Sequence, residues 1–330
     1  MDFSIIIPVF NRPFELDELL KSISKQKRDV DFEVIVVEDG SQVKSDLLVK
    51  EYEIFLNIKY FYKENSGPGD SRNFGVKKAK GDYLIFLDSD CILPNDYLQK
   101  VSLGLKNNFT DAFGGADKAH SSFTEWQKAI NYSMTSILTT GGIRGSEKVR
   151  NKFQLRSFNM GISKKSFLKI KGFSKQRFGE DIDLTYRLWE VENTTQFLPE
   201  AFVYHKRRAT WKQFFNQTFN FGAARPILSY KYPKSSKITF WFPVFFVLGI
   251  PLSIVGWLLD SQILAIIYAI YLLAIYVDSL LKDRNPIVAL LSIFTTITQF
   301  FGYGLGFIRS VFRIKILKKT PEDAFPKMFQ

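Results

Sequence analysis

Residues 83–90 have the sequence Tyr-Leu-Ile-Phe-Leu-Asp-Ser-Asp, an apolar run that ends in two aspartates. A short apolar run bounded by a polar turn is typical of a buried β-strand. Asp88 and Asp90 would then lie at the carboxyl end of this strand. Aspartates spaced D-x-D can contact a ribose and a divalent cation together, because Mg²⁺ and Mn²⁺ prefer one or two carboxylates plus phosphate oxygens. For an isolated D-x-D, a solvated turn is the alternative.

The preceding sequence alternates short apolar runs with amphipathic segments. Strands are predicted at residues 4–9, 32–37 and 58–62, and helices at residues 13–25 and 71–80. This βαβαβ order predicts an α/β fold with a mainly parallel, twisted sheet flanked by helices. Ligands of such sheets bind at the carboxyl ends of the strands.

The carboxyl ends of the first two predicted strands are also polar. Pro8 and Asn11 lie at the end of the first strand, and Asp39 lies at the end of the second. A carboxylate there can accept hydrogen bonds from a base or a ribose, so we predict a nucleotide site at this edge. Asp39 upstream of the D-x-D pair favours a functional pair over a solvated turn.

Three further segments can contribute to such a site. Residues 65–73, Asn-Ser-Gly-Pro-Gly-Asp-Ser-Arg-Asn, form a Gly/Pro-rich loop that opens a helix, and Arg72 can reach a phosphate or fix the loop to an acid. No Gly-Lys-Ser/Thr follows, which excludes a Walker-type loop. Glu180 and Asp181 precede a predicted helix, whose N-terminus favours acids by itself. His205 ends a predicted strand, where a lone histidine is more often structural than a ligand.

Together these segments resemble the family 2 glycosyltransferases. Six elements carry the resemblance, in order, over residues 1 to about 210. They are Pro8-x-x-Asn11, Val37-Glu38-Asp39-Gly40-Ser41, Gly67-Pro68-Gly69-x-x-Arg72-Asn73, Asp88-Ser89-Asp90, Asn159-Met160-Gly161 and Glu180-Asp181. The resemblance implies the GT-A fold, a nucleotide-diphosphate sugar donor, a divalent metal (Mg²⁺ or Mn²⁺) and inversion at the anomeric carbon.

The resemblance also implies roles for individual residues. Asp39 is similar to the acid that contacts the base, whereas Asp88 and Asp90 look like the ribose- and metal-binding pair. Asp181 looks like the catalytic base, with Glu180 beside it. His205 resembles a histidine that some members place near the metal. The other expected nucleotide-sugar-binding residues are Pro8, Asn11, Gly67, Arg72, Asn159 and Gly161. Glu38 replaces an Asp of many members, and no processivity motif appears, which favours addition of a single sugar.

The charge of +12 is unevenly distributed and divides the chain into four predicted parts. Residues 1–205, the predicted catalytic domain, have a net charge of +1, and residues 206–237, a basic amphipathic juxtamembrane segment, have +8. Residues 238–308 carry −1 and are predicted to form two to three transmembrane helices, followed by a +4 tail at residues 309–330. Bases beside apolar runs match anionic lipids better than nucleic acid, which we exclude as a partner.

Three uncharged runs lie in the predicted membrane part, at residues 238–259, 261–277 and 285–308. About 20 apolar residues cross a bilayer core. The excess of bases places residues 206–237 in the cytoplasm. Three full spans would put the basic tail outside, against the same rule, so a re-entrant or interfacial segment is the alternative for one run.

We therefore predict a multi-pass enzyme of the cell (inner) membrane with a cytoplasmic catalytic domain. The lone Cys91 and the lack of a visible signal peptide favour this location. The expected reaction transfers a sugar, with a UDP-sugar as the expected donor, to a hydroxyl of a lipid-linked or cell-surface glycan. A polyprenyl-phosphate sugar synthase, a nucleotidyltransferase and a non-catalytic membrane scaffold are the alternatives. The sequence does not specify the sugar, the linkage, the acceptor or the oligomeric state.

Overall fold

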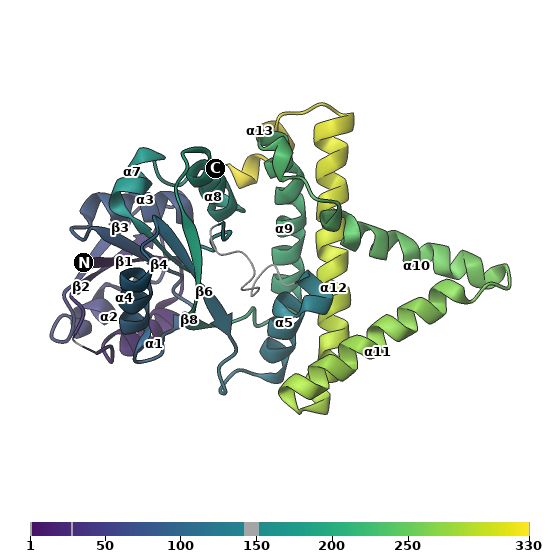
Figure 1. The fold of residues 1–330 in the computed structure, drawn as a ribbon, viewed down its shortest axis with the longest axis horizontal. Coiled ribbons are helices and arrows are strands. Elements are labelled where there is room, and N and C mark those ends of the chain that lie inside the picture. Colours follow the sequence, from purple (N-terminus) through teal and green to yellow (C-terminus); the bar gives the residue numbers. More distant parts are fainter. Residues whose placement is uncertain (1, 28, 142–151, 330) are drawn as a thin grey trace. The chain divides into compact units, whose positions relative to one another are not determined.

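The computed structural model describes residues 2–27, 29–141 and 152–329, and Figure 1 shows its elements. These residues form two compact units. The first unit comprises residues 2–120, 152–206 and 327–329, and the second comprises residues 121–141 and 207–326.

A mixed β-sheet forms the centre of the first unit. Its strand order within the described residues is β3-β2-β1-β4-β7-β6-β8-β5. The strands are β1 (Phe3–Val9), β2 (Phe32–Asp39), β3 (Ile58–Lys63), β4 (Tyr83–Leu87), β5 (Cys91–Ile92), β6 (Ala112–Lys118), β7 (Asn159–Ser163) and β8 (Thr195–His205). The first four in chain order are mutually parallel, as predicted, whereas β7 runs antiparallel to both β4 and β6. The fold is therefore α/β, with a parallel half and a mixed half.

Helices cover both faces of this sheet. They are α1 (Pro13–Ile23), α2 (Asp46–Tyr52), α3 (Pro68–Lys78), α4 (Tyr97–Asn107), α7 (Lys164–Lys169) and α8 (Glu180–Glu190). α1 begins at a proline, whose fixed φ suits the first helical position. Its buried apolar residues, spaced three and four apart on one face of the helix, are Leu16, Leu19, Leu20 and Ile23. Ile5 and Ile6 of β1 enter separate apolar clusters because alternate strand residues face opposite sides.

The parallel register brings the polar strand ends to one edge of the sheet. β1 lies between β2 and β4, and Val9 of β1 is the register partner of Glu38 in β2. α3 packs closely on this part of the sheet, because a Cβ atom at Gly75 would lie 2.6 Å from Cγ2 of Ile6. The ends of β1, β2 and β4 consequently lie together at one edge of the sheet.

The second unit is helical. Its helices are α5 (Glu125–Thr135), α6 (Ile137–Thr140), α9 (Trp211–Lys231), α10 (Phe242–Leu258), α11 (Ile263–Asp283), α12 (Pro286–Val311) and α13 (Pro321–Ala324). Helical turns extend α10 backward to Ile238 and α12 forward to Ile316. By length and composition, three segments suffice to cross a membrane: Ile238–Leu258, Ile263–Asp283 and Pro286–Ile316. They correspond to the three uncharged runs of the sequence.

Candidate active site

Asp39 ends β2 and organises the loop that precedes α3. Its carboxylate accepts hydrogen bonds from the backbone amides of Ser66 (3.0 Å) and Gly67 (2.9 Å) and from Nζ of Lys63 (2.6 Å). Burial alone would raise the pKa of Asp39, but the Lys63 ammonium and the Ser66 amide hold the pKa below its usual value. Asp39 is therefore an ionised acceptor at the sheet edge.

Arg72 of α3 joins two other predicted site residues. Gly67 adopts a φ of 96°, and Pro68 then begins the helix that carries Arg72 inward. The guanidinium is 2.6 Å from Oδ1 of Asp88 and 3.1 Å from Oε1 of Glu180. Arg72 is buried, which explains why it needs both acids. This link connects the end of β4 to the start of α8.

Glu180 and Asp181 begin α8 but have different surroundings. Glu180 is buried, and besides Arg72 it accepts a hydrogen bond from Oγ of Ser157 at 3.4 Å. Burial and the neighbouring Asp181 carboxylate raise the pKa of Glu180 to about 8. Asp181 is only half-buried, and it accepts from the amides of Ile182 (2.8 Å) and Ser157 (3.4 Å). Of the two acids, Asp181 has the more accessible carboxylate.

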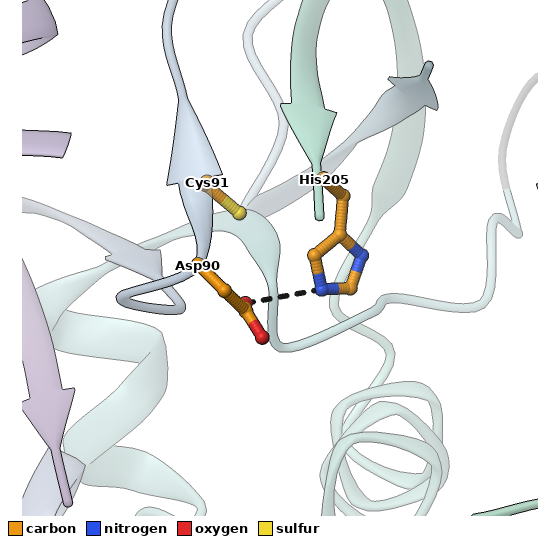
Figure 2. Close-up of side chains that lie close together, drawn as sticks. All are labelled: Asp90, Cys91 and His205. Carbon is orange, nitrogen blue, oxygen red and sulfur yellow. Dashed lines mark ion pairs between the residues drawn. The ribbon is translucent and has the colours of Figure 1, made fainter. Parts of the chain in front are cut away.

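Asp90 and His205 meet where β5 pairs with β8. The register partners there are Cys91 and His205, so the residue before Cys91 faces the imidazole. Figure 2 shows Oδ1 of Asp90 directed at Nε2 of His205, and the two atoms are 3.2 Å apart. The guanidinium of Arg12 forms an ion pair with Oδ2 of Asp90, and the ring of Phe158 stacks on His205 at 4.6 Å.

Asp90 and His205 have a geometry that suits a divalent cation. Neighbouring ligands on an octahedral ion with bonds of about 2.1 Å lie about 3 Å apart, close to the observed 3.2 Å. Cys91 lies near them but is buried, and its Sγ donates to the carbonyl of Phe158 at 3.5 Å. Burial raises the pKa of this thiol well above its usual value, and metals bind the thiolate. Asp90 and His205 are thus the better pair of ligands.

Asn11 and Pro8 lie at the same edge of the sheet as Asp39. Asn11 adopts a φ of 52°; its amide donates to Oγ of Ser41 at 2.7 Å, and its Oδ1 accepts from the amide of Gln42 at 2.8 Å. Asn11 therefore ties the end of β1 to the loop after β2. Pro8 is half-buried in β1, paired with Val37.

Asn159 and Gly161 lie inside β7, among core residues. Oδ1 of Asn159 accepts from the hydroxyl of Tyr97 at 2.7 Å, and Nδ2 donates to the carbonyl of Ala201 at 2.8 Å. A Cβ atom at Gly161 would lie 2.2 Å from the ring of Phe113. These contacts give both residue types a packing role, and their predicted donor-binding role stays a prediction.

Two cationic residues of the site were not assigned a role from the sequence. Lys63 is the register partner of Asp39 in β3, so a correct strand register would have identified it. Arg12 follows Asn11 directly, but its ion pair with Asp90 depends on where α1 begins. The strand register decides which charged residues face each other at the strand ends. Apolar periodicity alone does not fix this register.

Comparison with known proteins identifies the family of the chain. Residues 4–171 match the family described as Glycosyl transferase family 2. The chain belongs to this family. An uncharacterised glycosyltransferase of Haemophilus influenzae is 31% identical over 63% of this chain and 70% of its own length. TarS of Staphylococcus aureus, a poly(ribitol-phosphate) β-N-acetylglucosaminyltransferase, is 37% identical, but only 37% of this chain and 20% of TarS align.

Other relatives of this glycosyltransferase differ in how much of their length they share with it. Two rickettsial glycosyltransferases, 41% and 40% identical, align over 15% and 18% of their own length. A Campylobacter jejuni enzyme, GalNAc(5)-diNAcBac-PP-undecaprenol β-1,3-glucosyltransferase, is 26% identical over 67% of this chain and 68% of its own. Among solved structures, a Pyrobaculum calidifontis mannosyltransferase in complex with GDP-Man and Mn²⁺ has a TM-score of 0.60 at 15% identity, covering 94% of this chain and 86% of its own. The similarity to the Pyrobaculum calidifontis structure establishes the GT-A fold.

Proposed function

We propose that this family 2 glycosyltransferase is a metal-dependent, inverting enzyme of the membrane that adds one sugar to an acceptor hydroxyl. The observation that carries the proposal is the pairing of Arg72 with acids from two separate elements, Asp88 after β4 and Glu180 beside Asp181 at the start of α8. Arg72 thus holds the donor side of the site, at the strand ends, to the side of Asp181. A donor on the strand ends would therefore face the N-terminus of α8.

The donor side suits a nucleoside diphosphate. Asp39 is held ionised and accepts hydrogen bonds from backbone amides. A nucleotide base could replace these amides as the hydrogen-bond donor to the Asp39 carboxylate. Asp88 keeps a third of its side chain exposed despite its ion pair with Arg72, which leaves surface for a ribose hydroxyl. UDP-sugar is the expected donor class, whereas the structural neighbour from Pyrobaculum calidifontis carries GDP-Man.

Asp90 and His205 would hold the divalent metal, Mg²⁺ or Mn²⁺. Bound there, the ion would offset the negative charge that develops on the departing diphosphate. The Mn²⁺ of the structural neighbour supports this assignment. Arg12, already paired with Asp90, is positioned to contribute positive charge near the same carboxylate.

Asp181 acts in this proposal as the general base. Its carboxylate takes the proton of the acceptor hydroxyl while the oxygen forms a bond to C1 of the sugar. The bond from C1 to the diphosphate breaks on the opposite face, and its electron pair leaves with the nucleoside diphosphate. Positioned bases contribute about 10²- to 10⁴-fold in rate. Glu180 is fixed by Arg72 and instead orients the start of α8.

The acceptor is proposed to be a lipid-linked glycan of the cell envelope. Three apolar segments of the second unit are long enough to cross a membrane, and the +8 segment at residues 206–237 suits anionic lipid on the cytoplasmic side. The Campylobacter jejuni relative is named for an undecaprenol-linked acceptor, which supports the same class. A reactive hydroxyl of such a glycan lies close to the headgroup layer.

The test uses full-length protein purified in detergent. UDP-, GDP- and dTDP-sugars are each supplied with Mn²⁺ or Mg²⁺ and with either a polyprenyl-diphosphate-linked or a short water-soluble glycan. We expect release of nucleoside diphosphate that requires the metal and the lipid-linked acceptor. Equal turnover of the soluble acceptor would overturn the acceptor assignment, and release of pyrophosphate would identify a nucleotidyltransferase instead.

A further inference from the structure

The three apolar segments of the second unit differ in how far protein covers them. Each segment contains an apolar window of 18 residues. The buried share of this window is 17% in Ile238–Leu258, 11% in Ile263–Asp283 and 50% in Pro286–Ile316. A segment that crosses the bilayer as part of a small bundle presents most of its surface to lipid. α10 and α11 meet this description, whereas α12 is half enclosed by protein.

α9 lies directly against α12. A Cβ atom at Gly302 would lie 2.1 Å from Oγ1 of Thr218, and one at Gly306 would lie 2.1 Å from the carbonyl of Phe219. These two glycines, four residues apart, bring the helix backbones into direct contact. Nearer the start of α9, Nε1 of Trp211 donates to Oγ1 of Thr298 at 3.1 Å. α9 thus follows α12 over more than two turns, and the two helices run side by side in Figure 1.

α5 covers the earlier part of α12. Oγ1 of Thr295 donates to the carbonyl of Ala129 at 3.1 Å, and the rings of Trp126 and Phe294 are 6.0 Å apart. At the start of α12, Nδ2 of Asn285 donates to Oε1 of Glu125 at 3.3 Å. α12 is therefore accompanied by α5 and α9 from Asn285 to Gly306.

The companions of α12 are too polar to enter a bilayer core. α9 carries Lys212, Arg225 and Lys231 together with several amide side chains, and α5 carries Glu125 and Lys128. Each charge placed at the bilayer centre costs at least about 2.5 kcal/mol. If α12 crossed the membrane, both helices packed along it would enter the bilayer with these charges.

The path of the chain gives independent evidence on the number of crossings. Residues 152–206, which precede the apolar segments, and residues 327–329, which follow them, belong to the same first unit. Met328 is buried there, and its carbonyl accepts a hydrogen bond from the backbone amide of Arg177 at 2.7 Å. The first unit is rich in charge throughout and so lies wholly on one side of the bilayer. The intervening chain must then cross an even number of times.

We propose that the chain crosses the membrane twice, as a hairpin of α10 and α11, and that α12 lies along the bilayer surface on the side of the first unit. The uncharged runs of the two hairpin segments, residues 238–259 and 261–277, would extend about 33 Å and about 26 Å at 1.5 Å per residue, close to a hydrocarbon core of about 30 Å. The polar turn Asp260-Ser261-Gln262 reaches the opposite face.

The exposed apolar side chains of α12 would then contact acyl chains near the surface. They are Ile287, Leu290, Phe294, Leu305 and Phe312. The arrangement also places the tail with Arg313, Lys315 and Lys319 on the same side as the basic segment 206–237. Both basic segments then lie on the cytoplasmic side, where Lys and Arg are in excess in membrane proteins. Three crossings would instead place the basic tail on the opposite side. The proposal does not depend on the reaction that the enzyme catalyses.

The test labels single cysteines from each side of the membrane. Cys91→Ser supplies the background for every variant, because the buried Cys91 would become reactive once SDS unfolds the protein. Ser261→Cys reports on the hairpin turn, Lys319→Cys on the tail, and Ser236→Cys on the basic segment, and all three positions are exposed. A membrane-impermeant maleimide is applied to intact spheroplasts and to inverted vesicles of a bacterial host, with labelling in SDS giving the total.

We expect Ser261→Cys to be labelled in spheroplasts only, and Lys319→Cys and Ser236→Cys in inverted vesicles only. Labelling of Lys319→Cys from the spheroplast exterior would show three crossings and overturn the proposal. Labelling of Ser261→Cys on the same side as Ser236→Cys would show that the hairpin does not cross, and would overturn it equally. Gln262→Cys and Lys315→Cys replace any variant that does not accumulate in the membrane.

Discussion

The two units bury polar groups in different ways. In the first unit, the buried guanidinium of Arg72 pairs at one sheet edge with the buried Glu180 and with Asp88, a third of whose side chain is exposed. In the long apolar helices of the second unit, buried polar contacts are made by hydroxyls, such as Ser279 with Ser292 at 2.8 Å. The first unit gathers charge where we propose that a charged donor binds. The second exposes leucine and isoleucine along its apolar helices, which suits a lipid environment.

Removing the charge from Arg72 should have the largest effect on stability. Arg72→Met leaves Asp88 and Glu180 without their shared cation, and breaking a buried ion pair usually costs about 3–5 kcal/mol. Thermal unfolding in detergent would measure this loss. Lys77→Met, at an exposed position of the same helix, is the control and should change the stability by less than about 0.5 kcal/mol. Equal midpoints for the two variants would contradict the role of Arg72 as the link.

In the second unit the matching weak point is steric. A Cβ atom at Gly222 would lie 2.0 Å from the carbonyl of Tyr303, so Gly222→Ala should push α9 from α12 at a cost of about 1–3 kcal/mol. Gly256→Ala is the control, since its Cβ would meet only the carbonyl of Ser261, at 3.2 Å. If thermal unfolding showed Gly222→Ala to be as stable as the control, close packing would not be what joins the two helices.

Glu180 is also expected to make the stability of the first unit depend on pH. Its pKa is raised from an ordinary 4.5 to about 8, so between these pH values the folded protein holds a proton that the unfolded chain releases. Stability from this group is therefore lost as the pH rises through that window. Glu180→Gln should flatten the fall in thermal midpoint from pH 5 to pH 8, whereas Glu190→Gln, exposed on the same helix, should not. An unchanged slope in Glu180→Gln would assign the pH dependence to other groups.

The sequence predicts the parallel half of the sheet well because its strands are short apolar runs bounded by polar residues. The mixed half was not predicted in detail, since β6 and β7 pair through register rather than composition. α2 has a single buried residue, Val49, and so leaves little apolar pattern to detect. The site was predicted as a set of acids, but the cations that hold them, Arg12 and Lys63, depend on three-dimensional pairing.

The membrane part shows the same limit. The runs that became α10, α11 and α12 look alike in the sequence because hydropathy counts the charges within a run and not the helices packed beside it. Gly302 and Gly306 contain the missing information, since they mark where α9 approaches α12, but their partners are 84 and 87 residues earlier in the chain.

In the proposed mechanism, donor binding and proton removal depend on different acids of one site. Calorimetric binding of UDP, with and without Mn²⁺, would be measured alongside sugar transfer for the wild type, Asp90→Ala and Asp181→Asn. We predict that Asp90→Ala loses the Mn²⁺-dependent part of UDP binding. Asp181→Asn should bind UDP as the wild type does but transfer sugar about 10²- to 10⁴-fold more slowly. Wild-type transfer by Asp181→Asn, or unaltered Mn²⁺-dependent binding by Asp90→Ala, would contradict the claim.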